Sequence, residues 1–222
     1  MKRVLLPIVF VLTVFISCEQ DNYEKGEGRY SLMRGDFAEL RIDADLRATT
    51  IVTDDLERLS LKEPYTAKWI ARPDTTYRCL LYYNKVDDKA EVISMGQVPC
   101  PPIVSLGEFE EKVCTDPVKL ESIWLSKSGK YLNMSLQLKT GHTDDTTAVQ
   151  HLAFVSDTLL VNPDKTQTLY IRLHHDQGNV PEYYSIQSYV SLPTDKIPAD
   201  SVRLIVNTYS GLIVRTLQLP KR

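Results

Sequence analysis

The stretch Ala38-Glu39-Leu40-Arg41-Ile42-Asp43 carries the pattern that decides the fold of this chain. Apolar residues alternate with charged ones, and successive side chains of a β-strand point to opposite faces. One apolar row therefore packs against a core, while one charged row faces water. The stretch predicts a half-buried β-strand, and the same pattern recurs along the chain after it.

Similar segments follow in the first half of the chain. Asp54-Asp55 closes one of them, and Pro99 ends another because proline cannot donate a hydrogen bond to a neighbouring strand. The segments cover residues 49–53, 77–83 and 90–98. Four or five short strands before residue 105 favour a small β-barrel.

In the second half the alternating segments become more regular, and turn residues separate them. Lys127-Ser128-Gly129 and Tyr209-Ser210-Gly211 supply the glycines that tight connections need, so the strands that they join run antiparallel. The predicted strands cover residues 119–126, 130–138, 149–155, 168–174, 183–191, 202–208 and 213–219. Seven strands are typical of a β-sandwich.

The two halves are separated by an acidic segment, residues 107–116, that holds no alternating apolar row. We place the domain boundary near residue 115. The expected organisation is a signal peptide at 1–17, a tether at 18–28, a barrel domain at 29–115 and a sandwich domain at 116–222. No stretch has the period of a long amphipathic helix, so the sequence predicts an all-β protein.

The first residues are typical of a signal peptide. Lys2 and Arg3 precede an apolar stretch, residues 5–16, that ends at Ser17-Cys18. A membrane-spanning helix needs about 20 apolar residues, and this stretch is much shorter. We expect it to be removed rather than to persist as an anchor.

Phe15-Ile16-Ser17-Cys18 resembles the lipobox of bacterial lipoproteins, in which the cysteine receives the lipid. It predicts cleavage before Cys18 and anchoring to a membrane through acyl chains on that residue. The alternative is a plain signal peptide with a free Cys18. Glu19-Gln20-Asp21-Asn22 resembles the tag that directs some lipoproteins to the cell surface, and a solvated tether explains the same residues. We expect a lipid-anchored protein of the cell envelope, in the outer membrane, on either face.

The charge balance bears on possible partners. The chain carries 26 Lys and Arg against 29 Asp and Glu, and cleavage would remove Lys2 and Arg3. The mature protein is therefore acidic, and no basic patch indicates a nucleic-acid partner.

Three cysteines remain besides the lipid site: Cys79, Cys100 and Cys114. Outside the cytoplasm two of them could pair, and a bridge from Cys100 to Cys114 would close a short loop at the domain boundary. Three unpaired thiols are the alternative, since Cys79 lies inside an apolar strand pattern.

Several motifs together resemble the NigD-like lipoproteins of Bacteroidetes. In the second half these are Tyr131-Leu132-Asn133 after a glycine turn, His151 at the start of an apolar strand, and residues 169–174 followed by Asp176 and Gly178. In the first half the agreement is Ile51-Val52-Thr53-Asp54-Asp55, although Leu56 stands where the turn is expected to hold a glycine. The resemblance implies an OB-like barrel followed by an immunoglobulin-like sandwich, and a link to bacteriocin immunity.

Metal-binding and catalytic patterns are weak. His174-His175-Asp176 offers metal-ligand chemistry, but adjacent strand residues point to opposite faces, so a histidine hydrogen-bonded to a loop is expected instead. No nucleophile elbow, zinc-binding helix, phosphate loop or dinucleotide fingerprint occurs in the sequence. We predict no catalytic residue, no metal and no cofactor.

Aromatic residues are the candidate binding groups: Trp69, Tyr82 and Tyr184 could anchor a partner or stack on a sugar. Trp69, in the loop-like segment 68–73, is the better candidate for an exposed contact. The sequence thus predicts a non-catalytic envelope lipoprotein that binds a protein or peptide, with bacteriocin immunity as the role implied by the resemblance. The alternative is a glycan-binding accessory lipoprotein.

Overall fold

The structure, a computed structural model, describes residues 32–220. The predicted signal peptide, Cys18 and the tether up to residue 28 lie outside the described residues. Within them the chain forms thirteen strands and one short 3-10 turn, so the prediction of an all-β fold is confirmed. The first five strands are β1 (Arg34–Ile42), β2 (Ala48–Thr53), β3 (Arg58–Tyr65), β4 (Thr76–Val86) and β5 (Lys89–Gln97).

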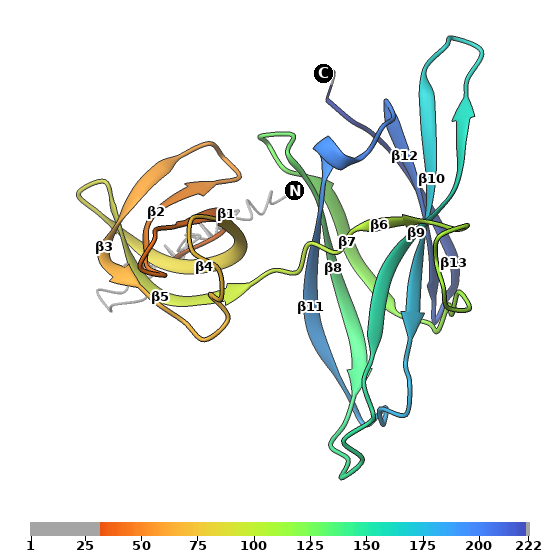
Figure 1. The fold of residues 1–222 in the computed structure, drawn as a ribbon, viewed down its shortest axis with the longest axis horizontal. Helices are drawn as coiled ribbons and strands as arrows, with labels where there is room; N and C mark the ends of the chain where they lie inside the picture. The colour runs from red at the N-terminus through yellow and green to blue at the C-terminus, as the bar shows by residue number, and fades with distance from the viewer. Residues whose placement is uncertain (1–31, 221–222) are drawn as a thin grey trace, which may run out of the picture. The chain divides into compact units, whose positions relative to one another are not determined.

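These five strands close into a barrel in the order β1-β2-β3-β5-β4 (Figure 1). β1 pairs antiparallel with both β2 and β4, and a short parallel contact between β3 and β5 closes the barrel at Ser60 and Leu61. A five-stranded barrel of this order is the OB-like arrangement that was predicted. Closure leaves few free strand edges in this domain.

Buried apolar residues alternate with more exposed ones along β1, as the sequence pattern predicted. Ala38, Leu40 and Ile42 of β1 are 0–1% exposed, and Cys79, Leu81 and Tyr83 of β4 are fully buried beside them. Each large apolar side chain buried in this way contributes about 1.5–3 kcal/mol to folding. The connection 66–75 packs against the barrel core, where Ile70 is buried and Ala67 and Trp69 are partly buried.

The turn between β2 and β3 contains the residue that departs from the expected glycine. Leu56 has φ +68° and is exposed, and the turn is closed by the Leu56 N–H donating to the carbonyl of Thr53. A left-handed backbone conformation is unfavourable for a residue with a Cβ, so this turn is strained. The resemblance led us to expect a glycine at this position, and a positive φ is the conformation that glycine adopts most readily.

The second domain has two sheets (Figure 1). The five-stranded sheet has the order β13-β12-β10-β9-β6, and the three-stranded sheet has the order β11-β8-β7. The strands are β6 (Ile103–Ser105), β7 (Lys119–Leu125), β8 (Tyr131–Thr140), β9 (His151–Val161), β10 (Gln167–Asp176), β11 (Tyr184–Pro193), β12 (Ser201–Thr208) and β13 (Gly211–Gln218). All seven predicted strands are present, which confirms the sandwich.

β6 bears on the domain boundary. Ile103–Ser105 pair in parallel with Phe154, Val155 and Ser156 of β9, so these residues belong to a sheet of the sandwich. The boundary near residue 115 stays a prediction, but the strand pairing of the second domain begins before it. A three-residue strand after a proline-rich run has too few residues for an alternating pattern to be recognised.

The sandwich core lies between its two sheets. Leu132, Met134 and Leu136 of β8 face Phe154, Ile171 and Leu204 of the other sheet, and all six are fully buried. Gly129, with φ +72°, permits the tight β7–β8 turn, and a Cβ there would come within 2.5 Å of Pro220.

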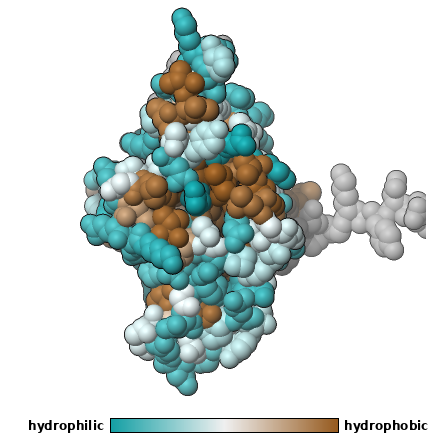
Figure 2. All heavy atoms as spheres, turned by 90° about the vertical axis from the view of Figure 1, so that its right-hand side faces the viewer, coloured by the Kyte–Doolittle hydropathy of each residue, from teal (hydrophilic) through white to brown (hydrophobic). Residues whose placement is uncertain are grey.

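The surface of the sandwich carries several exposed apolar side chains, among them Leu159, Leu160 and Val161 of β9 and Leu212 of β13. Figure 2 shows that the apolar residues on this side of the molecule form separate patches divided by hydrophilic residues.

Removing a central side chain tests the packing of the sandwich. Phe154→Ala should lower the free energy of unfolding by about 3–5 kcal/mol, because it leaves a cavity between the two sheets. Leu212→Ala, at a position that is 66% exposed, should change it by no more than about 0.5 kcal/mol. Urea unfolding followed by circular dichroism measures both, and similar losses in the two variants would contradict this account of the core.

Candidate functional site

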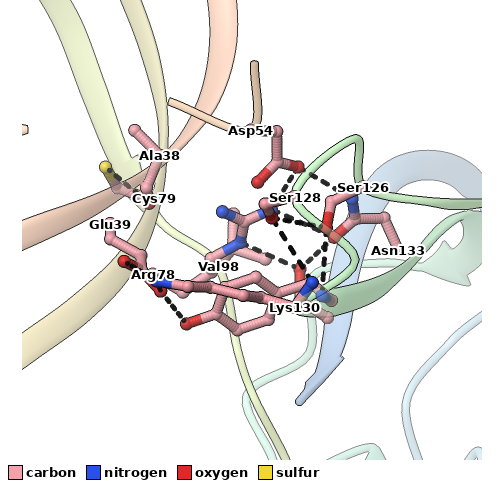
Figure 3. A network of polar contacts seen from close by, with 12 residues as sticks. Ala38, Glu39, Asp54, Arg78, Cys79, Val98, Ser126, Ser128, Lys130 and Asn133 are labelled. Atoms are coloured by element: carbon pink, nitrogen blue, oxygen red, sulfur yellow. Dashed lines mark hydrogen bonds and ion pairs between the residues drawn. The ribbon is translucent and has the colours of Figure 1, made fainter. Parts of the chain in front are cut away.

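A buried arginine joins the barrel to the sandwich (Figure 3). The side chain of Arg78 on β4 is 2% exposed, and its Nη2 lies 2.6 Å from Oδ2 of Asp54 in the barrel. Nη2 also donates to Oδ1 of Asn133 on β8, and Nε donates to Oγ of Ser191 on β11. A buried guanidinium is costly unless its donors are paired. Nε and Nη2 of Arg78 find acceptors in both domains, whereas its buried Nη1 makes no hydrogen bond to any described residue, so separating the barrel from the sandwich would leave still more of the cation unpaired.

The partners of Arg78 also bond one another. Asn133 Nδ2 donates to Asp54 Oδ2 at 3.0 Å, and Ser191 Oγ donates to Asn133 Oδ1 at 2.7 Å. The guanidinium lies over the ring of Tyr131, 4.1 Å from its centroid, which adds a cation–π contact. We call Arg78, Asp54, Asn133 and Ser191 the junction network.

Aromatic packing extends the junction beyond the network. The ring of Phe37 on β1 meets Trp124 of β7 and Tyr189 of β11 edge to face, with centroids 5.5 Å and 5.3 Å apart. Such pairs contribute about 0.5–1.5 kcal/mol beyond the area that they bury. The barrel therefore covers part of the outer face of the three-stranded sheet.

Next to this junction is a groove of about 430 Å³. Its barrel side comes from β4, β5 and the residues after β5, and its sandwich side comes from β11. The lining residues are Leu80, Tyr82, Ser94, Met95, Gly96, Gln97, Val98, Pro99, Gln187, Ser188 and Tyr189. We call this the β11 groove.

The β11 groove combines apolar and neutral polar groups. Tyr82 is 38% exposed and lies against Gly35, where a Cβ would come within 3.1 Å of the tyrosine ring. A Cβ at Gly96 would meet no atom within 4 Å, so the space above that residue is open. No carboxylate, imidazole, amine or thiol is among the described lining residues, and the groove suits binding better than acid–base chemistry.

A second hollow, of about 450 Å³, is lined by residues that include Glu39, Lys130, Tyr131 and Asp195. Its polar groups bond one another: Lys130 Nζ lies 2.9 Å from Glu39, and the Tyr131 hydroxyl donates to Glu39. Burial and the nearby Glu39 carboxylate raise the pKa of Tyr131, so its hydroxyl stays protonated as a donor. These satisfied pairs make the hollow a weaker candidate than the β11 groove.

The three aromatic residues predicted to bind a partner lie in different places. Tyr82 lines the β11 groove, and Tyr184 is 57% exposed at the start of β11, outside the groove lining. Trp69 is half-buried rather than prominent, because its ring packs against Tyr65 and Tyr77 at the end of the barrel. Binding by these residues stays a prediction, and Tyr82 has the position that best fits it.

His174 and His175 form hydrogen bonds with the loop that contains Cys114 and Asp116. The backbone N–H of Cys114 donates to Nδ1 of His174, and Nδ1 of His175 donates to the carbonyl of Asp116. The ring of Phe109 packs on His174 at 4.9 Å. Among the described residues no group of three His, Cys, Asp or Glu side chains could hold a metal ion.

The three thiols are unpaired in the structure. Cys79 is buried in the barrel, where its thiol donates to the carbonyl of Ala38, and burial raises its pKa to about 12. Cys100 is exposed after β5, and Cys114 is half-buried in the loop beside His174. The described part of the chain thus has three unpaired thiols, which was the alternative to a bridge between Cys100 and Cys114.

The geometry defines a class of two-domain β-protein, in which an OB-like barrel is fixed to the outer face of a sandwich and leaves a groove beside an edge strand. The sequence profile of the NigD-like C-terminal beta sandwich domain matches residues 101–218. The chain therefore belongs to the NigD-like family, as the motifs in the sequence indicated. No match was found among curated proteins.

Solved structures share this fold. A NigD-like immunity protein from Bacteroides caccae is 21% identical with TM-score 0.62, covering 83% of this chain and 91% of that one. A putative toxin-related protein from Parabacteroides distasonis is 16% identical with TM-score 0.60, covering 84% and 92%. A putative lipoprotein from Bacteroides fragilis is 10% identical with TM-score 0.57, covering 86% and 98%. At these identities the likeness establishes the fold.

The junction network can be tested by removing its cation. Arg78→Met should lower the free energy of unfolding by about 3–5 kcal/mol, because it leaves the Asp54 carboxylate without its cation and removes the hydrogen bonds from the guanidinium to Asn133 and Ser191. Lys127→Met removes a cation from the exposed neighbour Asp55, 3.7 Å away, and should cost less than about 1 kcal/mol. Urea unfolding compares the two variants, and equal losses would mean that the network contributes no more than a surface ion pair.

Thiol reactivity tests the arrangement of the cysteines. In the soluble protein that begins at Glu19, the exposed Cys100 should react with Ellman's reagent under native conditions, although slowly, because partial burial raises its pKa to about 11. The fully buried Cys79 should react only after unfolding. Cys100→Ser should remove the reaction seen under native conditions. If no thiol of the native, unreduced protein reacts, Cys100 and Cys114 are bridged after all.

Proposed function

We propose that this protein is a non-catalytic lipoprotein of the cell envelope that binds a protein or peptide partner in the β11 groove. The observation that carries the proposal is the composition of that groove. Tyr82, Tyr189 and Leu80 give it apolar contact area, and the side chains of Gln97 and Gln187 offer neutral hydrogen-bonding groups. Tyrosine is enriched where one protein binds another, because its large ring loses little conformational freedom.

The partner that we propose is a secreted toxin, against which the protein protects the cell that carries it. This role is supported by the family and by two structures of the same fold, one described as a NigD-like immunity protein and one as a putative toxin-related protein. A sandwich and a barrel host many functions, so the role has to be tested on this chain itself.

The proposed location is the outer membrane, with Cys18 as the lipid attachment site. None of the described residues forms a helix with the length and apolar character that crossing a membrane requires. The likeness to a putative lipoprotein from Bacteroides fragilis agrees with a lipid anchor. Lipid attachment can be measured by the mass of the mature protein and by its loss in Cys18→Ala.

Affinity capture tests the binding function. The mature protein, purified from membranes in detergent and immobilised, is exposed to material secreted by competing strains. The matched control is Gly96→Leu, which fills the groove from a position with open space. We expect a protein or peptide to be retained by the original chain and to be several-fold depleted on the variant.

A growth assay then tests immunity. A sensitive strain that carries the gene should survive the retained toxin, and a strain that carries Gly96→Leu should not. Equal retention on both immobilised proteins would reject the β11 groove as the site. Recovery of polysaccharide alone would replace the proposal with the glycan-binding alternative.

A further inference from the structure

β11 is an edge strand with one side open. It pairs with β8 on one side only, and the direction of its backbone groups can be read from two hydrogen bonds. The N–H of Thr194 donates to Lys130 at the start of β8, whereas the N–H of Ser191 points the other way and donates to Pro99. Because N–H and C=O groups alternate along an antiparallel pair, Gln187 and Tyr189 also direct theirs away from β8.

A segment of the chain itself already binds the C-terminal part of this edge, at Ser191. After β5 the backbone crosses to β11, where the Pro99 carbonyl accepts the N–H of Ser191. Residues 100–103 then line a cavity of about 370 Å³ together with Leu192 and Pro193. On the N-terminal side of Ser191, Ser185 and Gln187 of β11 are exposed. No described residue outside β8 makes a backbone hydrogen bond to them.

Apolar surface lies on both sides of the open part of the edge. On the barrel side is the β11 groove with Leu80 and Tyr82. On the other side, Tyr184 and Ile186 share the strand face of the buried Val190, yet they are 57% and 45% exposed. A strand placed beside β11 would direct alternate side chains to these two surfaces.

We propose that the partner segment recognised here is an extended peptide that adds to β11 as a further strand, on the N-terminal side of the Ser191–Pro99 hydrogen bond. This inference rests on the proposed function and names the chemistry by which the site recognises its partner. The backbone groups of Gln187 and Tyr189 pair with the backbone of the peptide. Its alternate side chains enter the β11 groove and cover Tyr184 and Ile186, so apolar residues at every second position are favoured.

A polypeptide fits this site for a specific reason. The outward donors and acceptors of β11 recur every second residue, which is a spacing of about 6.8 Å that an extended peptide backbone shares. The position is also continuous with the Ser191–Pro99 contact, in which a segment of this chain already bonds the same edge. Because Pro99 already bonds the N–H of Ser191, the added peptide cannot pair with β11 on the C-terminal side of Tyr189.

Gln187 gives a matched pair of variants. Gln187→Pro removes the outward N–H and places a proline ring on the open side of an edge strand, where proline leaves the pairing with β8 intact. Gln187→Thr keeps the N–H. Both variants lose the side-chain hydrogen bond from Gln187 to Ser135. The difference between their peptide affinities therefore reports the contribution of the backbone N–H at position 187.

The probe is a displayed library of random twelve-residue peptides, selected on the mature full-length protein in detergent. Retained peptides are synthesised, and their dissociation constants are measured on the original chain and on both variants, with thermal unfolding as the check on folding. We expect Gln187→Pro to bind about tenfold or more weakly than Gln187→Thr, because both variants lose the glutamine side chain from the groove and only Gln187→Pro also loses the outward N–H. Hydrogen exchange at the Gln187 and Tyr189 amides should slow when the peptide is bound.

Several outcomes would overturn the inference. If no peptide is retained, or if both variants bind equally well, a peptide does not add to β11, and a toxin captured in the earlier experiment would still support the proposed function. If peptide binding leaves exchange at Gln187 and Tyr189 unchanged, the peptide lies elsewhere. If the protein is a dimer that Gln187→Pro dissociates, the occupant of the edge is a second copy.

Discussion

The burial of one cation governs the arrangement of this molecule. Arg78 extends from the barrel into a site where its side chain is almost inaccessible to water, and desolvating a guanidinium costs several kcal/mol. Asp54 supplies the counter-charge from the barrel, but Asn133 and Ser191 supply acceptors from the sandwich. Nη1 stays unpaired among the described residues, but Nη2 and Nε need acceptors from both domains, so the two domains are thermodynamically coupled.

The same coupling explains why polar residues are buried on the outer face of the sandwich. Asn133, Ser135 and Ser191 are 0–3% exposed, although they alternate with the apolar residues that face the core. The barrel covers them, and Phe37 packs between Trp124 and Tyr189 at the edge of the covered area. The β11 groove exists because this contact stops short of the open side of β11.

Much of the fold could be predicted from the sequence, because alternation reports directly on which face of a strand is buried. The strands of the sandwich and most strands of the barrel follow from it. β3 was not specified, since its apolar pair Leu59 and Leu61 is followed by charge and Pro64. β6 is too short to show a period, and its place beside β9 depends on residues some fifty positions away.

The site could be predicted only in part. Tyr82 was a candidate from its residue type, and the structure places it in the groove. No pattern in the neighbouring sequence marks Gln187, Tyr189 or Gly96 as binding residues. They form one site only because the fold brings residues of β5 and β11 to the same groove. Trp69 was expected to be exposed, but Tyr65 and Tyr77 pack around it. Tyr131-Leu132-Asn133, which indicated the family, lies at the junction between the domains rather than in the groove.

The pairing of β6 with β9 has a practical meaning for dissecting this protein. A fragment cut at residue 116 would lack Ile103–Ser105, and the backbone of β9 around Phe154 would become an open edge of the kind that promotes aggregation. It would also lose the backbone of Cys114, to which His174 and His175 are tied. The smallest self-sufficient sandwich therefore begins ahead of Ile103, within the chain that links it to the barrel.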